Sequence, residues 1–181
     1  MNYVDPIKSR DDVHKVENWL AEHSMRNRLI FAIGTNTGLR VSDILGLNVS
    51  DVYGRNYIAI REKKTNKYKR FPLNNKLQKL MKDYLTDVPK SNEPLFVGKK
   101  HHRLHRSQVY RFLNEACSAV GVKENVGTHT MRKTFGYHHF KQNNDIVLLQ
   151  KIFNHSSPAV SLFYIGLDQE TIDMSYKNFE L

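Results

Sequence analysis

The spacing of apolar residues changes once along this chain, and that change restricts the fold more than any other feature. Up to residue 45, and again from residue 75, apolar residues recur at the three- and four-residue spacing of helices. Between them, the segments YIAIRE (57–62) and YKRFPL (68–73) have the composition of strands and are separated by a polar turn. We therefore predict a mainly helical α+β fold with a small antiparallel β-sheet.

Capping residues indicate where the helices begin. Ser9, Ser24 and Asp145 each precede an apolar helical pattern, and Ser157 is followed by a proline at the first helical position. Further predicted helices begin at or near Ser42, Asn75, Ser107, Thr128 and Gln169. The segment PLFVG (94–98) is interpreted as a third short strand.

Length and composition exclude several classes of protein. A chain of 181 residues fits one domain, so we expect a single domain over residues 1–181. The lone cysteine, Cys117, excludes an intrachain disulfide framework and a cysteine-rich zinc site. The sequence has no apolar run of membrane-spanning length, and its N-terminal segment lacks the apolar core of a signal peptide. We expect a cytoplasmic protein with no membrane partner.

The net charge of +10 is concentrated in two short segments. Residues 61–70 hold six basic residues and one acidic residue, and residues 99–111 hold five basic residues and no acidic one. Such a segment alone is often only a solvated loop, but two of them on an otherwise balanced chain favour a surface that binds nucleic acid. The predicted DNA-binding residues are Lys63, Lys67, Lys69, Arg70, Lys99, Lys100, Arg103, Arg106 and Arg111.

Two places in the sequence suit a phosphate group. His129 and Arg132 are three residues apart, so on one helix they share a face near its N-terminus, where an anion is favoured. Arg40 follows a turn-like segment and precedes the helix predicted at Ser42. Taken singly, His129 and Arg132 are more often a surface pair, and Arg40 is more often the salt-bridge partner of Asp43 or another acid.

These residues belong to a larger pattern. Four segments resemble, in order, the conserved boxes of the tyrosine recombinase or phage-integrase family: TGLRVSDIL (37–45), HTMRKTFGYH (129–138), IFNHSSPAV (152–160) and LFYIG (162–166). His155 follows Arg132 by 23 residues and precedes Tyr164 by nine, which is typical of the family. The segment KTNKYKRFPL (64–73) resembles the strand-turn-strand that carries the family's lysine. The resemblance covers nearly the whole chain.

The resemblance implies a complete catalytic set, which consists of Arg40, Lys64, His129, Arg132, His155 and Tyr164. It implies that Tyr164 attacks a DNA phosphate, which gives a 3′-phosphotyrosyl link and a free 5′-hydroxyl. A phenol with a pKa of about 10 needs a base or a cationic pocket at neutral pH, and His129 is the expected proton acceptor. Arg40 and Arg132 are expected to hold the phosphate oxygens, with His155 as a further donor.

Lys64 is expected at the tip of the hairpin, where the resemblance implies that it protonates the departing 5′-oxygen. The sequence offers no evident carboxylate cluster for Mg²⁺, so we expect neither a metal nor another cofactor. Asn154 stands where the family usually has glycine, and Phe163 stands where an arginine commonly precedes the tyrosine. Neither departure removes a reacting group.

The resemblance also implies a function and partners. We expect a site-specific recombinase that integrates, excises or inverts DNA, acting on double-stranded DNA as a tetrameric synapse. The family's N-terminal core-binding domain has no counterpart here, so we expect a naturally short recombinase or an excised catalytic domain. Residues 169–181 are expected either to contact a neighbouring protomer or to pack on their own domain. Two alternatives are a regulator that occupies recombination sites without cutting and a type IB topoisomerase-like enzyme.

Overall fold

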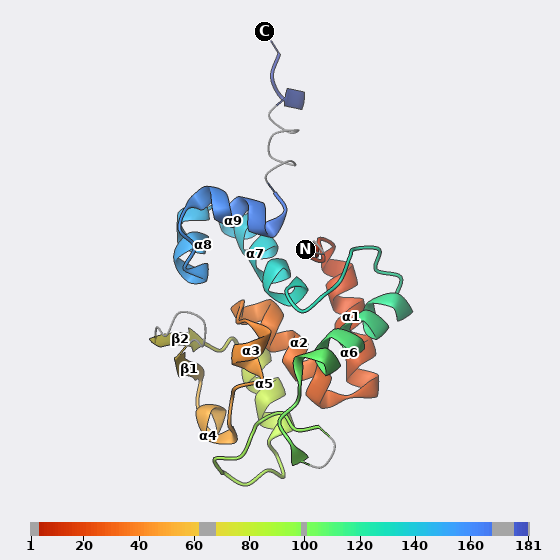
Figure 1. Cartoon of the computed structure of the whole chain (residues 1–181), viewed down its shortest axis with the longest axis vertical. Helices are drawn as coiled ribbons and strands as arrows, with labels where there is room; N and C mark the ends of the chain where they lie inside the picture. Colours follow the sequence, from red (N-terminus) through yellow and green to blue (C-terminus); the bar gives the residue numbers. More distant parts are fainter. Residues whose placement is uncertain (1–3, 62–67, 99–100, 168–175, 181) are drawn as a thin grey trace.

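Helices dominate the computed structural model, which describes residues 4–61, 68–98, 101–167 and 176–180 (Figure 1). Its elements follow in the order α1 (Arg10–His23), α2 (Met25–Thr37), α3 (Val41–Ile44), α4 (Val49–Val52), β1 (Tyr57–Arg61), β2 (Tyr68–Pro72), α5 (Asn75–Tyr84), α6 (Arg106–Ala119), α7 (Thr130–Asn143), α8 (Ile146–Phe153) and α9 (Pro158–Ile165). The predicted mainly helical α+β fold with a small antiparallel sheet is confirmed. Within the described ranges, each helix is too short or too polar to cross a bilayer.

Four helices begin where the sequence supplies a cap. The side chains of Ser9, Ser24, Asp145 and Ser157 each accept a hydrogen bond from a backbone N–H in the first turn of α1, α2, α8 and α9. α2 ends at Gly38, whose φ of 66° is a left-handed conformation that glycine adopts without strain. The predicted starts of these four helices are confirmed.

Three other helix starts differ from the prediction by one or two residues, and the first is α3, which begins at Val41 and not at Ser42. α6 is capped by His105, because the His105 ring accepts from the N–H of Ser107 while the side chain of Gln108 reaches back to the His105 N–H. Ser107 is therefore already inside the helix. α7 has His129 as its N-cap residue, one position after the predicted Thr128.

The predicted third strand at 94–98 is wrong. Pro94 forms an isolated bridge with Asn48, and Val97 forms one with Arg103. The two ends of the segment thus face different loops, and a proline contributes no N–H to a ladder, so no continuous strand pairing develops. The sequence prediction also missed α4, because four residues are too few to show a helical period.

The small sheet consists of two antiparallel strands in the described part of the chain. Ile60 of β1 lies opposite Lys69 of β2. Ile58 is fully buried, and Phe71 packs against the same core, so one face of the hairpin is anchored in the domain. The turn over residues 62–67 lies outside the described residues, as do the predicted site residues Lys63, Lys64 and Lys67.

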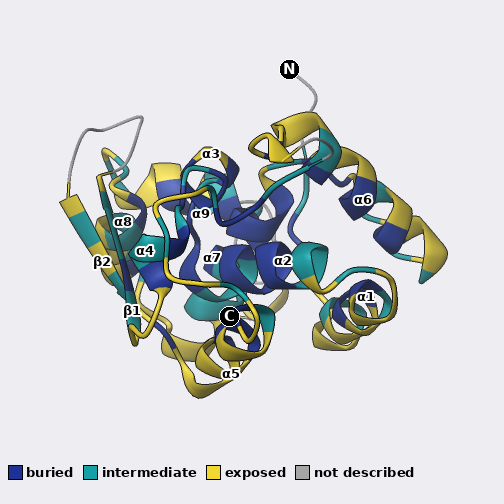
Figure 2. Ribbon diagram, turned by 90° about the horizontal axis from the view of Figure 1, so that it is seen from below, coloured by how far each residue is buried: buried dark blue, intermediate teal, exposed yellow. Residues whose placement is uncertain are grey.

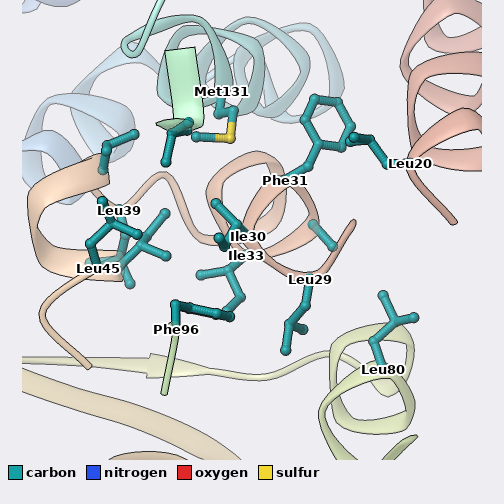
Figure 3. Close-up of a cluster of buried hydrophobic side chains, with 14 of the residues drawn as sticks. Leu20, Leu29, Ile30, Phe31, Ile33, Leu39, Leu45, Leu80, Phe96 and Met131 are labelled. Atoms are coloured by element: carbon teal, nitrogen blue, oxygen red, sulfur yellow. The ribbon is translucent and has the colours of Figure 1, made fainter. Parts of the chain in front are cut away.

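The core has two parts. The larger one surrounds α2, which is buried along most of its length (Figure 2). Figure 3 shows Ile30 and Ile33 of α2 among the side chains of this cluster, with Met131 beside them. The smaller cluster lies on the last three helices and consists of Tyr137, Leu149, Phe153, Ile165 and Leu167.

A close crossing of α2 and α7 joins the two parts. A Cβ atom at Gly34 would lie 2.8 Å from the Cβ atom of Met131, so only glycine permits this approach. α9 also packs closely on α7, since a Cβ atom at Gly136 would lie 2.6 Å from a methyl carbon of Ile165. These two contacts bring the first turn of α7, the loop after α2 and α9 together at one place.

Candidate active site

Arg132 is the best-anchored residue of the predicted set. It lies in the first turn of α7, and only 4% of its surface is exposed. Its guanidinium donates one hydrogen bond to the carbonyl of Gly38, at the end of α2, and another of 3.0 Å to the carbonyl of Phe153, at the end of α8. The guanidinium also stacks 4.2 Å from the Phe153 ring centre. Arg132 is therefore fixed by the ends of two helices.

Tyr164 lies on α9 with its hydroxyl directed at His129. The hydroxyl oxygen is 3.3 Å from Nδ1 of His129, and the two rings meet edge to face. The Tyr164 ring also packs edge to face against Phe153 and His155, with ring centres 5.6 and 5.1 Å away. A tyrosine held on three sides by aromatic rings has few rotamers available, so its oxygen is preorganised beside the imidazole.

The electrostatic surroundings of Tyr164 act in opposite directions. Burial, the largest cause, raises the pKa of its hydroxyl above the ordinary value of 10.0. The positive charges of Arg132 and Arg40, together with a hydrogen bond to Arg132, lower the pKa without outweighing burial. The phenol therefore keeps its proton near pH 7, and a base has to accept that proton if the oxygen is to act as a nucleophile.

Arg40 contributes to the same site from the start of α3. It is the N-cap residue of α3, only two positions after the Gly38 carbonyl that holds Arg132, and its side chain is partly exposed. Its positive charge is one of the influences that oppose the burial-driven rise in the pKa of the Tyr164 hydroxyl. The structure therefore gathers two guanidinium groups at one tyrosine.

His155 is oriented by a serine. Its Nδ1 lies 3.0 Å from the hydroxyl of Ser161, which is fully buried on α9. Asn154, immediately before it, has a φ of 54° and ends α8 in the left-handed conformation. Asparagine tolerates this conformation better than most residues, so the turn that the family makes with glycine is retained despite the departure. Phe163, the other departure, is 62% exposed.

Two residues near the site were missed by sequence reasoning. Ser161 was not singled out, although a serine on the inner face of an apolar helix is a usable signal. Lys133 is 5% exposed, and its Nζ lies 5.3 Å from the centre of the Tyr164 ring. Burial lowers the pKa of the Lys133 ammonium group, and the negative charge of Asp5 partly offsets this lowering. α7 buries residues 130–134 without a break, so no amphipathic pattern distinguished this lysine.

The predicted DNA-binding residues fall into different situations. Lys99 and Lys100, like the turn lysines, lie outside the described residues. Arg103 donates to the carbonyls of Leu45 and Leu47, at 2.7 and 2.9 Å, and thereby braces the loop after α3. Arg106 and Arg111 of α6 are exposed, and Arg70 is also exposed, with its guanidinium over the ring of Tyr57. Lys69 contacts a main-chain carbonyl of α8.

The chain resembles known integrases and recombinases in sequence. The sequence model of the phage integrase family matches residues 9–170. The chain is 40% identical over 180 residues to the probable integrase/recombinase YoeC of Bacillus subtilis, a match that covers 99% of this chain and 98% of YoeC. It is 30% identical over 177 residues to the tyrosine recombinase XerH of Campylobacter jejuni, covering 96% of this chain but 48% of XerH. The chain thus spans nearly all of one relative and about half of another.

Solved structures share the fold. The crystal structure of XerA recombinase superposes with a TM-score of 0.79 at 22% identity, over 99% of this chain and 68% of XerA. A λ integrase dimer bound to a COC′ core site gives a TM-score of 0.70 at 19% identity, over 91% of this chain and 60% of the integrase. With the family match over residues 9–170 and a full-length relative at 40% identity, the chain belongs to the tyrosine recombinases of the phage integrase family.

Proposed function

We propose that this protein cuts and rejoins double-stranded DNA at specific sites, with Tyr164 as the nucleophile. The observation that carries the proposal is the hydroxyl of Tyr164, which lies 3.3 Å from an imidazole nitrogen of His129 and within the field of two arginines. A nucleophile, a base and fixed cationic donors are the groups that metal-free phosphoryl transfer requires. The functional names of the relatives agree with this chemistry.

The proposed step exchanges one phosphodiester bond for another. The Tyr164 oxygen attacks the phosphorus, the O–P bond to tyrosine forms, and the bond to the 5′-oxygen breaks. The phenolic proton passes to His129, and the departing 5′-oxygen gains a proton from Lys64. A 5′-hydroxyl of a second strand then attacks the 3′-phosphotyrosyl link and reverses the step. The covalent link conserves the bond energy, so the reaction needs no nucleotide cofactor.

Arg132, Arg40 and His155 have the proposed role of stabilising charge on the phosphate. A guanidinium carries five N–H donors, so the two backbone contacts of Arg132 do not exhaust its capacity to bind a phosphate oxygen. Because those contacts fix Arg132 before DNA binds, little reorganisation is needed in the transition state. Ser161 would hold the His155 ring in the orientation required for donation.

The proposed partner is double-stranded DNA, which a tetramer of this chain would hold in a synaptic complex. Two similar structures support a DNA-bound assembly, since one is XerH bound to a palindromic difH substrate and the other is a λ integrase dimer bound to a core site. The exposed Arg106 and Arg111 offer phosphate contacts, and such contacts make binding weak at high salt. We also propose that the protein acts in the cytoplasm and that residues 1–181 act as one catalytic domain.

A covalent-capture experiment tests the proposal. A pool of nicked duplexes with a randomised core, in which cleavage releases a short fragment carrying the new 5′-hydroxyl, is incubated with the protein in EDTA and run on a denaturing gel. We expect a protein–DNA adduct that disappears in Tyr164→Phe and persists in Tyr176→Phe, a change at an exposed tyrosine in the C-terminal segment. Sequencing of the adducts then identifies the site.

Each outcome points to one function. DNA binding without any covalent adduct would indicate that the protein is a regulator that occupies recombination sites without cutting. An adduct together with relaxation of plasmids that lack the site, and no exchange between two sites, would favour the topoisomerase-like activity. Recombination between two captured sites, abolished in Tyr164→Phe, supports the proposal.

A further inference from the structure

Lys133 carries a buried charge that the proposed reaction does not use. It directly follows Arg132 in the first turn of α7, and only 5% of its surface is exposed. A lysine side chain is costly to bury, because its ammonium group loses contact with water and has to be stabilised by partners inside the protein. The groups that stabilise this ammonium group therefore indicate what Lys133 does.

One of these groups is the ring of Tyr164. Nζ of Lys133 lies over this ring, 5.3 Å from its centre. The face of an aromatic ring attracts a cation, and the attraction is stronger where water is excluded. The rings of His129, Phe153 and His155 already pack edge to face against the Tyr164 ring. The ammonium group adds a charged contact to these three, and a contact of this kind depends on how the ring is tilted.

A second influence on Lys133 is the negative charge of Asp5. This charge raises the pKa of the ammonium group and partly offsets the lowering by burial, so it favours the charged form. Asp5 belongs to the segment before α1, which lies beside α7 (Figure 1). The N–H of Ile7 in this segment donates a hydrogen bond of 2.9 Å to the hydroxyl of Thr134. Since Thr134 directly follows Lys133, this bond keeps the segment of Asp5 against the turn of α7 that carries the lysine.

The first turn of α7 thus carries two neighbouring cations with different contacts. Arg132 donates hydrogen bonds to two backbone carbonyls, whereas the ammonium group of Lys133 lies over the Tyr164 ring. The hydroxyl oxygen is at the end of this ring remote from the backbone, so a tilt of the ring moves it relative to Nδ1 of His129, which is 3.3 Å away. Reactions slow steeply when the reacting groups leave their near-attack geometry. A group that fixes the tilt of the ring therefore affects the reaction without contacting the DNA.

We propose that Lys133 is a positioning residue, whose ammonium group holds the Tyr164 ring in the orientation that directs its hydroxyl at His129. The inference rests on the proposed function, because it takes Tyr164 as the nucleophile. Lys133 acts through this tyrosine, and Asp5 supports the contact by favouring the charged form of the lysine.

The first test determines the orientation of the ring directly and needs no DNA. Crystal structures of the unaltered protein, Lys133→Met and Lys133→Arg are compared. Lys133→Met removes the ammonium group but keeps much of the apolar stem, and Lys133→Arg keeps a cation. We expect the Tyr164 hydroxyl to lie beyond about 3.5 Å from Nδ1 of His129 in Lys133→Met, and to stay within hydrogen-bond reach in Lys133→Arg.

The second test measures cleavage of the captured DNA site in single-turnover reactions. We expect Lys133→Met to slow cleavage roughly 10- to 100-fold at saturating DNA and to change the affinity for DNA less than about twofold. Lys133→Arg is expected to recover most of the rate. Asp5→Asn is expected to slow cleavage less strongly, and to have no further effect in a protein that already carries Lys133→Met, because the charge on which Asp5 acts is then absent.

Lys141→Met is the matched control. Lys141 lies on the same helix, is exposed, and has its Nζ 5.7 Å from the centre of the Tyr137 ring, which is not part of the proposed machinery. We expect this variant to cleave at the rate of the unaltered protein. Urea unfolding checks that each variant is folded, and Lys133→Gln replaces Lys133→Met if the latter does not fold.

Several results would overturn the inference. They are an unmoved Tyr164 ring in Lys133→Met, an unchanged cleavage rate, a loss of DNA affinity alone, and a Lys133→Arg variant that cleaves as slowly as Lys133→Met. If the unaltered protein forms no adduct with DNA, the proposed function fails instead. The crystal structures then still decide whether Lys133 fixes the ring, so the two failures are distinct.

Discussion

The substitution Gly38→Ala, which adds a single carbon atom, tests how the fold supports the candidate active site. A Cβ atom there would lie 2.5 Å from Cδ1 of Phe135 and 3.0 Å from Cε1 of Phe153. The residue has a φ of 66°, and its carbonyl accepts a hydrogen bond from Arg132. Gly38→Ala therefore combines backbone strain with a clash beside Arg132, which has a catalytic role under the proposed function. We expect it to destabilise the protein and to slow DNA cleavage.

The two contributions can be separated with a matched glycine. The left-handed conformation costs a residue with a Cβ atom about 1–2 kcal/mol, of which about 0.4–1 kcal/mol is offset by the stiffer unfolded chain. Overpacking against two aromatic rings adds about 1–3 kcal/mol. Gly54 has nearly the same φ, 67°, but a Cβ atom there would meet nothing within 4 Å. We expect a loss of about 2–4 kcal/mol for Gly38→Ala and about 1 kcal/mol for Gly54→Ala.

Urea unfolding followed by circular dichroism measures the difference in the free energy of unfolding between these variants. Cleavage of the captured DNA site is then compared at a temperature where both variants are folded, and we expect at least a roughly tenfold slower reaction for Gly38→Ala alone. Unfolding free energies within about 0.5 kcal/mol of each other would refute the steric argument. A destabilised Gly38→Ala that cleaves at the normal rate would refute the link between this carbonyl and Arg132.

Other residues give independent tests. Asn154 has a φ of 54°, so we expect Asn154→Ala to lower the free energy of unfolding by about 1 kcal/mol and Asn154→Gly not to lower it; equal urea midpoints would contradict this. Ser161→Ala removes the hydroxyl 3.0 Å from His155 and is expected to slow cleavage roughly tenfold without weakening DNA binding, which a titration and a time course on the same DNA distinguish. Burial raises the pKa of Cys117 to about 12, so we expect its thiol to react with a disulfide reagent at pH 8 only after urea unfolds the chain. Burial also raises the pKa of Tyr164 above its unfolded value of 10.0, so its contribution to stability is fully present below that pH and is lost as the pH rises through the folded pKa. Above pH 10 we therefore expect the urea midpoint to fall less with pH in Tyr164→Phe than in the unaltered protein.

Features with local causes could be predicted from the sequence, and features with distant causes could not. The starts of α1, α2, α8 and α9 depend on caps and apolar spacing within a few residues, so the sequence alone indicated them. The segment 94–98 failed because its pairing depends on two separate loops. The anchoring of Arg132 depends on carbonyls 94 and 21 residues away, and no pattern in the sequence reveals those contacts. The expected roles of the site residues were based on the family resemblance. The structure adds the arrangement that brings five of these residues together.

The surroundings of Tyr164 restrict how its proton can leave. Burial raises the pKa of the hydroxyl, and the charges of Arg132 and Arg40, with a hydrogen bond to Arg132, partly offset that rise. A DNA phosphate bound by these arginines brings a negative charge next to the hydroxyl and weakens that offset. Under the proposed function, DNA binding therefore does not prepare a phenolate in advance, and the proton must move while the bond to phosphorus forms. His129, with Nδ1 at 3.3 Å from the hydroxyl oxygen, is the residue that we expect to accept the proton in that step.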